Sequence, residues 1–170
     1  MGDVTKDRKM FLASTESMLT VQGRMRSRVF RKGALVLTNS GATLGVPKIL
    51  TIEGCANDGI VGFQRVSSEA CIEYLYYFLD SLTAMFRDRI KQGCGQPNLN
   101  TNIVGSTPVL VPPRDEQVAI VDWISRKADE VERLVEMVEL AVNNLNEYRS
   151  ALISAAVTGK IDVRREVAVR

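Results

Sequence analysis

Short runs of Val, Ile and Leu alternate with turn residues in the first part of the chain. Residues 34–38, 48–52 and 60–66 are three such runs. The first and third lie between Gly and Asn or Ser, and the second is ended by Glu53 and Gly54. This pattern is typical of β-strands between tight turns. A fourth apolar run, residues 104–111, predicts a further short strand. We therefore expect a small sheet within roughly the first 111 residues.

The hydrophobic period changes between residues 71 and 90. Apolar residues there recur three and four positions apart, which predicts a helix of about five turns that ends before Gly93. Its aromatic residues Tyr74, Tyr77 and Phe78 share the apolar stripe. We interpret them as core residues rather than as a platform for stacking bases.

A longer periodic pattern follows the pair Pro112 and Pro113. Prolines favour the start of a helix, and Asp115 and Glu116 then place acid at the positive end of its dipole. Nine of the ten heptad positions up to Leu152 are apolar, the exception being Arg149, and Gly159 follows as a stop signal. The predicted helix-pairing positions are Val121, Ile124, Val131, Val135, Val138, Val142, Leu145 and Leu152.

A helix over residues 115–157 would be roughly 60 Å long at about 1.5 Å per residue. Its single apolar stripe predicts pairing with another helix as a coiled coil. The alternative is that the helix folds back on residues 1–113. Together the patterns predict an α+β fold. A small, mixed, β-rich domain (1–111) precedes one long helix (112–160) and a tail (161–170).

Charge is distributed unevenly along the 170 residues, whose net charge is +2. Residues 1–113 hold 13 Lys and Arg against 9 Asp and Glu, whereas residues 114–170 hold 9 against 11. Five basic residues fall within nine positions: Arg24, Arg26, Arg28, Arg31 and Lys32. This cluster could face phosphates. It could equally be the solvated face of a strand.

The residue inventory disfavours catalysis. The chain has three cysteines, no CxxC pair and no histidine, which disfavours a zinc site and histidine-based acid–base chemistry. Its carboxylates form no convincing pair, so we predict a binding protein with no cofactor and no metal. No apolar stretch is long enough to span a membrane, and we expect a cytoplasmic protein with reduced cysteines.

Two polar segments are candidate binding loops. Residues 39–45 contain two glycines but lack the spacing of a phosphate-binding P-loop. Glycines let a backbone approach a ligand closely, and hydroxyls can donate to phosphates. The candidates here are Thr38, Ser40, Gly41, Thr43 and the following Lys48. The amides of Gln96 and Asn98 could bind bases or phosphates, or could simply form turns.

Four segments carry a resemblance to a known family: LVLTNSGATLG (35–45), QPNLN (96–100), VLVPPRDEQ (109–117) and ALISAAVTGKIDVR (151–164). In this order they resemble the DNA specificity subunit of type I restriction–modification systems. The resemblance implies target recognition domains, each followed by a long helix, with paired helices that dock the modification subunits. Methyl transfer and DNA cleavage would belong to other chains.

With one domain and one helix, the chain resembles half of a specificity subunit or its C-terminal part. The resemblance implies double-stranded DNA, methyltransferase and restriction subunits as partners. The single apolar stripe of the long helix separately predicts a homodimer, or pairing with a partner subunit. It also favours a structural or backbone-contacting role for Gln96 and Asn98. The alternative hypothesis is a truncated interaction protein that dimerises through its helix without reading DNA.

Overall fold

The computed structural model describes residues 2–7, 9–41, 43–91 and 99–165. The chain divides into two compact units, Met1–Asp122 and Trp123–Arg170. The first contains the sheets and the shorter helices. The second contains most of the long helix. The division falls after the boundary at residue 111 that the sequence pattern had indicated.

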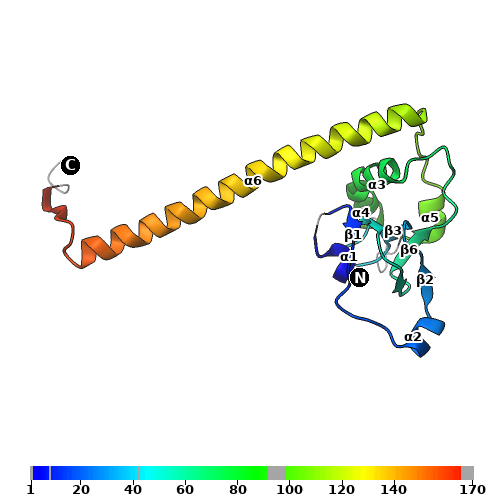
Figure 1. The fold of residues 1–170 in the computed structure, drawn as a ribbon, viewed down its shortest axis with the longest axis horizontal. Helices are drawn as coiled ribbons and strands as arrows, with labels where there is room; N and C mark the ends of the chain where they lie inside the picture. The colour runs from blue at the N-terminus through cyan, green and yellow to red at the C-terminus, as the bar shows by residue number, and fades with distance from the viewer. Residues whose placement is uncertain (1, 8, 42, 92–98, 166–170) are drawn as a thin grey trace. The chain divides into compact units, whose positions relative to one another are not determined.

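A four-stranded mixed sheet forms the centre of the first unit (Figure 1). Its strands, in spatial order, are β1 (Phe11–Leu12), β4 (Pro47–Leu50), β3 (Leu35–Thr38) and β6 (Ile60–Phe63). β1 and β4 are parallel, whereas β3 is antiparallel to both β4 and β6. The three strands predicted from the apolar runs at 34–38, 48–52 and 60–66 are therefore confirmed, with shorter bounds.

A two-stranded antiparallel ribbon accompanies this sheet. It pairs β2 (Arg28–Phe30) with β5 (Gly54–Ala56). The helices before the ribbon are short: α1 (Gly2–Thr5) begins the chain, and α2 (Val21–Met25) lies at the far end of β2 in Figure 1.

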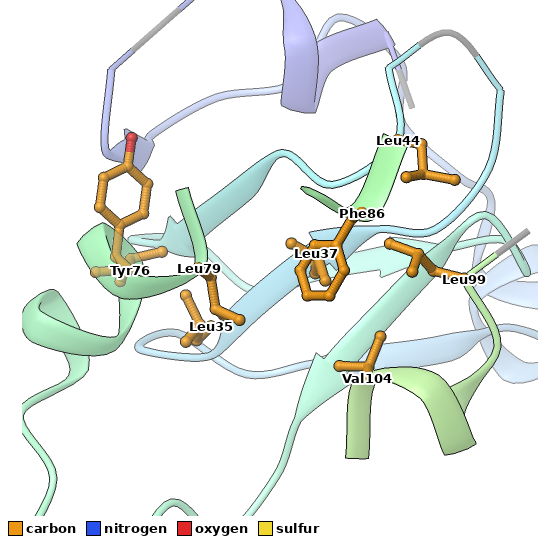
Figure 2. Close-up of a cluster of buried hydrophobic side chains, with 9 residues drawn as sticks. Leu35, Leu37, Leu44, Tyr76, Leu79, Phe86, Leu99 and Val104 are labelled. Atoms are coloured by element: carbon orange, nitrogen blue, oxygen red, sulfur yellow. The ribbon is translucent and has the colours of Figure 1, made fainter. Parts of the chain in front are cut away.

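Strand β3 is buried on both faces, because it separates two hydrophobic clusters. Leu35 and Leu37 join one cluster, and Val36, which points the other way, joins the second. The first cluster is drawn in Figure 2: Leu35, Leu37, Leu44, Ile49, Tyr76, Leu79, Phe86, Leu99 and Val104. The second contains Val4, Phe30, Val36, Leu50 and Ile60. A strand covered on both sides reads as a continuous apolar run, as this one does.

The helix predicted between residues 71 and 90 is present but is divided in two. α3 (Ile72–Ser81) and α4 (Thr83–Lys91) meet at Leu82, the C-cap of α3. Both helices contribute to the first cluster, through Tyr76 and Phe86. The break lets Thr83 donate a hydrogen bond to the carbonyl of Gly45 (2.7 Å), which ties α4 to the loop after β3.

The prediction of a strand at residues 104–111 is wrong. Its first residues belong to a short helix instead, α5 (Thr101–Gly105), whose N-cap Asn100 accepts a hydrogen bond from the Ile103 amide at 2.8 Å. Residues 108–113 have no regular structure. Pro108, Pro112 and Pro113 lack the amide hydrogens that a strand pairs through, and prolines punctuate chain structure rather than extend it.

Phe30 packs across Gly62 and so ties the ribbon to the sheet. A Cβ atom at Gly62 would overlap Cε1 and Cδ1 of the Phe30 ring. Phe30 itself is buried in the second cluster. The missing side chain at Gly62 therefore makes room for an aromatic ring.

The long helix α6 runs from Arg114 to Val157, within one residue of the predicted start and at the predicted end. Its residues up to Asp122 belong to the first unit. Gly159 follows the helix with a φ of 73°, and the Lys160 amide donates to the Ala155 carbonyl at 2.9 Å. This is the expected glycine stop. A 3₁₀ turn, η1 (Val163–Arg165), lies in the tail. No helix among the described residues is both long and apolar enough to cross a membrane.

Candidate nucleic-acid and subunit interfaces

The five clustered basic residues lie on and around the β2–β5 ribbon. Arg24 is in α2, Arg26 caps its C-terminus, and Arg28 opens β2. Arg31 and Lys32 form the turn that leads to β3, where Gly33 has a φ of 85°. All five are exposed. The structure therefore brings the predicted cluster together on one part of the first unit.

Two of these arginines are held by groups of the same chain. Arg24 pairs with Glu53. Arg28 donates to the carbonyls of Asn57 and Ile60, each at 3.2 Å, and stacks over Phe30 at 5.8 Å from its centroid. These contacts orient Arg28 and limit its freedom to reach a phosphate.

The other three basic residues remain available. Within the described part of the chain, the side chains of Arg26, Arg31 and Lys32 make no hydrogen bond or ion pair. An exposed cation without an internal partner keeps its full charge for an external anion. These three residues are therefore the strongest candidates in the cluster for phosphate contact.

The glycine segment predicted as a DNA-facing loop is mostly internal. Thr38 is fully buried, and its hydroxyl donates to the Thr43 carbonyl at 2.6 Å and accepts from the Val46 amide at 2.9 Å. Ser40 and Thr43 are half-buried, and only Gly41 is exposed. Gly41 and Gly45 have φ values of 73° and 85°, so both glycines are needed for the turn. Thr38 is thus a loop-closing residue and not a contact for DNA.

Lys48 is also not a phosphate contact, because its side chain is only 1% exposed. Its ammonium group donates to the Asp7 carboxylate at 2.6 Å, to the Asp7 carbonyl at 3.0 Å and to the Lys9 carbonyl. The hydrogen bond from Lys48 is the main cause that lowers the pKa of Asp7 below 3.8. A buried charge is tolerated when it is paired in this way.

A cleft of about 540 Å³ lies beside this pair. It is lined by Thr5, Lys6, Asp7, Thr43, Val46, Lys48, Tyr76, Asp80, Thr83 and Arg87. Burial, with the Asp80 carboxylate as the second cause, raises the pKa of Tyr76 to about 12. Its phenol therefore stays protonated at neutral pH. Arg87 donates to the Leu44 carbonyl at 2.9 Å, which braces the glycine segment from α4.

The predicted amides Gln96 and Asn98 lie outside the described residues. Their neighbour Asn100 caps α5 through its side chain, as given above. At this position the amide stabilises local backbone, which is one of the two roles that the sequence left open.

A contact that sequence reasoning missed fixes the start of α6. Gln117 is fully buried, and its carbonyl oxygen accepts from the Cys71 amide at 2.7 Å. Its amide nitrogen donates to the carbonyls of Glu69 and Pro112, each at 2.8 Å. Arg114 adds a bond to the Ser68 carbonyl at 2.7 Å. A glutamine in the acidic first turns of a helix was the only available signal.

Beyond Asp122, the predicted helix-pairing residues carry apolar surface that is not covered. Ile124 is half-buried, and so is Val121 at the end of the first unit. The others are exposed: Val131, Val135, Val138, Val142, Leu145 and Leu152. Further exposed apolar residues accompany them, among them Leu134, Met137, Leu140 and Tyr148. The predicted pairing residues share one stripe of the helix, and an exposed apolar stripe of this kind is a candidate interaction site.

Among the described residues, no group of His, Cys, Asp and Glu side chains could hold a metal ion. Cys55 and Cys71 are free thiols. The two candidate surfaces are therefore a basic one on the first unit and an apolar one on the second.

The fold is an α+β domain followed by one long helix, which is the class predicted from the sequence. It is similar to a solved structure described as showing complex assembly and conformational transition of the type I R-M system. The TM-score is 0.66 at 18% identity, over 76% of this chain and 31% of that chain. The crystal structure of a type I restriction–modification S subunit from M. genitalium gives a TM-score of 0.50 at 19% identity, over 68% of this chain and 32% of that one.

The family model for the type I restriction modification DNA specificity domain matches residues 8–135. The chain belongs to this family, as the four quoted segments had indicated. It spans about a third of the length of the two solved chains, since it covers 31% and 32% of them.

Proposed function

We propose that this chain is a DNA-recognition subunit, or the C-terminal half of one, of a type I restriction–modification complex. Its first unit binds double-stranded DNA, and its long helix binds protein. The observation that carries the proposal is the exposed basic cluster on a domain of the DNA specificity family. Methyl transfer and DNA cleavage then belong to other chains, so that this one contributes recognition alone.

Three residues carry most of the phosphate contact in this proposal: Arg26, Arg31 and Lys32. Each is exposed and has no internal partner within the described residues. A cation that displaces a counterion from DNA lowers the slope of log K against log salt by about 0.9. Arg24 and Arg28 contribute less, because Glu53 and the carbonyls of the ribbon already bind them.

The test is a fluorescence anisotropy titration of labelled duplex DNA at several salt concentrations. Replacing Arg26 and Arg31 by Gln is expected to weaken binding and to reduce the salt slope by about two. The matched control is Lys160→Gln, which removes one charge outside the cluster and should leave the slope unchanged. If wild-type protein binds no duplex at low salt, the chain does not recognise DNA by itself and the proposal fails.

We also propose that α6 pairs with a second copy of the chain and docks the modification and restriction subunits. Its exposed valines and leucines support this, because exposed apolar surface of this extent is stabilised by burial against a partner. Changing Val131 and Val138 to Asp would place unpaired charges in the seam. Sedimentation should then show loss of the dimer. An unchanged dimer would contradict helix pairing through these positions.

A second candidate function is an interaction protein that assembles through α6 without reading DNA. The observation that favours it is the coverage of only 31% and 32% of the solved chains. It predicts that partner binding persists when residues 1–110 are removed, and that the anisotropy titration shows no duplex binding. The same two experiments therefore separate the two functions.

A further inference from the structure

The structure points to a second kind of contact beside the basic cluster. We propose that residues 18–25 insert apolar side chains, chiefly Met18 and Met25, into a groove of the duplex. This inference rests on the proposed function, because the basic cluster must first bind the DNA. It adds an apolar element to an interface that so far consists of cations.

The segment exposes an unusual amount of apolar surface for so few residues. Met18 is 93% exposed and Met25 is 81% exposed. Leu19 and Val21 between them are exposed as well. Four exposed apolar side chains within eight residues are a local concentration of the kind found at interaction sites.

This segment is held in place by its own hydrogen bonds. The Thr20 hydroxyl caps α2 by accepting from the Gly23 amide at 3.1 Å. Ser27 donates to the Gly23 carbonyl at 2.8 Å, and Arg24 pairs with Glu53. On its C-terminal side, Phe30 is buried in the second cluster. Val21 and Met25 are therefore presented from a capped helical turn, which reduces the entropy lost on binding, whereas Met18 and Leu19 lie in the irregular segment before it.

The charges around the patch are predominantly basic, which favours a polyanion. Five basic residues follow Thr20 before Gly33, against the flanking acids Glu16 and Glu53, of which Glu53 pairs with Arg24. Met25 lies directly between Arg24 and Arg26. A protein partner would have to supply matching acid, whereas DNA supplies it along every turn of its backbone.

Some DNA-binding proteins combine basic residues that contact phosphates with apolar side chains that insert between bases. Proteins that bind the minor groove hold the phosphates with basic residues and wedge Met, Leu, Ile or Phe between base steps, which unstacks them. Methionine suits such a site because its unbranched side chain adapts to irregular gaps. An exposed Met25 at the end of α2, in a segment that also carries Arg26, which is unpaired within the described residues, fits this chemistry.

The experiment uses the full chain and a duplex selected by the wild-type protein from a random-sequence pool. Met18→Ser together with Met25→Ser is compared with Leu110→Ser, an exposed apolar residue of the same unit outside the patch. Anisotropy gives affinity and salt slope. A series of duplexes with 2-aminopurine at successive positions reports local unstacking by a rise in fluorescence.

We expect the methionine variant to bind about a hundredfold more weakly, since each of the two methionines contributes about a factor of ten or more when buried. Its salt slope should equal that of wild type, because no charge is lost. The fluorescence rise seen with wild type should disappear. Leu110→Ser should match wild type in all three measurements, and circular dichroism should show the same fold for every variant.

The inference is overturned if the methionine variant keeps wild-type affinity and fluorescence while Arg26→Gln with Arg31→Gln weakens binding. In that case the proposed function stands and the apolar patch does not contact DNA. It is also overturned if the methionine changes alter only the mass in solution, which would assign the patch to a protein interface. If wild type binds no duplex, the proposed function itself fails and this inference fails with it.

Discussion

The two units of this protein treat apolar side chains in opposite ways. In the first, Leu35, Leu37 and Phe86 are completely buried between the sheet and the helices. In the second, Val138 is 61% exposed and Leu145 is 66% exposed. The first unit gains its stability within itself, through burial of apolar area. The second unit presents apolar side chains that are exposed, so the contrast separates residues that stabilise the fold from residues that remain available for contact.

The contrast predicts different outcomes for the same substitution in the two units. Leu37→Ala should destabilise the first unit by about 2–5 kcal/mol, because it opens a cavity in a packed core. Leu145→Ala should leave the unfolding of that unit unchanged and weaken assembly instead. Urea denaturation and sedimentation distinguish the two effects. If Leu145→Ala destabilised the first unit as strongly as Leu37→Ala, the two residues would not differ in role as we infer.

A smaller effect is expected where the ribbon meets the sheet. Gly62→Ala should cost about 1–3 kcal/mol, because the added methyl overlaps the Phe30 ring and forces it to move. Gly54→Ala is the matched control in the neighbouring ribbon, where a Cβ atom meets nothing within 4 Å. Adding Phe30→Leu should recover part of the loss in the Gly62 variant. Equal stability of the Gly62→Ala and Gly54→Ala variants would show that the Phe30 ring can move aside without loss of packing.

Gln117 tests how far the first unit extends into α6. Gln117→Ala removes the partner of the Cys71 amide and of two carbonyls, and should cost about 1–3 kcal/mol. Hydrogen exchange at the Cys71 amide should become faster. Glu116→Ala, at the exposed neighbouring position, should cost less than Gln117→Ala, because it removes only a charge near the helix N-terminus, and should leave exchange of the Cys71 amide unchanged. Continued protection of the Cys71 amide in the Gln117 variant would contradict this role.

The Asp7–Lys48 pair predicts an effect that is recognised by its pH dependence. The folded-state pKa of Asp7 is below 3.8, its value without these contacts, so its contribution to stability is present above that pH. It is lost as the pH falls through the lower, folded-state pKa. Asp7→Asn should therefore lower stability at pH 7 and abolish this part of the acid dependence. Thermal unfolding of both proteins across the acidic range measures the difference.

Local patterns predicted the periodic elements of this chain well. The heptad repeat and Gly159 placed α6 to within one residue, because a long helix repeats its signal many times. Residues 104–111 show the opposite case. Their apolar content favoured a strand, whereas the cap at Asn100 and the proline at 108 determine a short helix and an irregular segment.

For the candidate site, the sequence predicted which side chains are exposed only where a dense run of charged residues requires contact with water. A dense run of arginines stays in water, so the exposure of Arg26 and Arg31 could be anticipated. Lys48 could not be placed, because its partner Asp7 lies 41 residues away and a lysine is rarely buried. Thr38 was misjudged for a related reason. Its hydroxyl closes a loop through the Thr43 carbonyl and the Val46 amide, contacts that depend on the folded path of the chain.

The buried amide of Gln117 has a consequence for how such proteins could exchange parts. A recombination that joined one recognition domain to another helix at the double proline would separate Gln117 from the Cys71 amide and the Glu69 carbonyl that it binds. A chimera joined after Asp122 would keep all of these partners within one parent. We therefore expect viable hybrids to carry the first turns of α6 with the domain that precedes them.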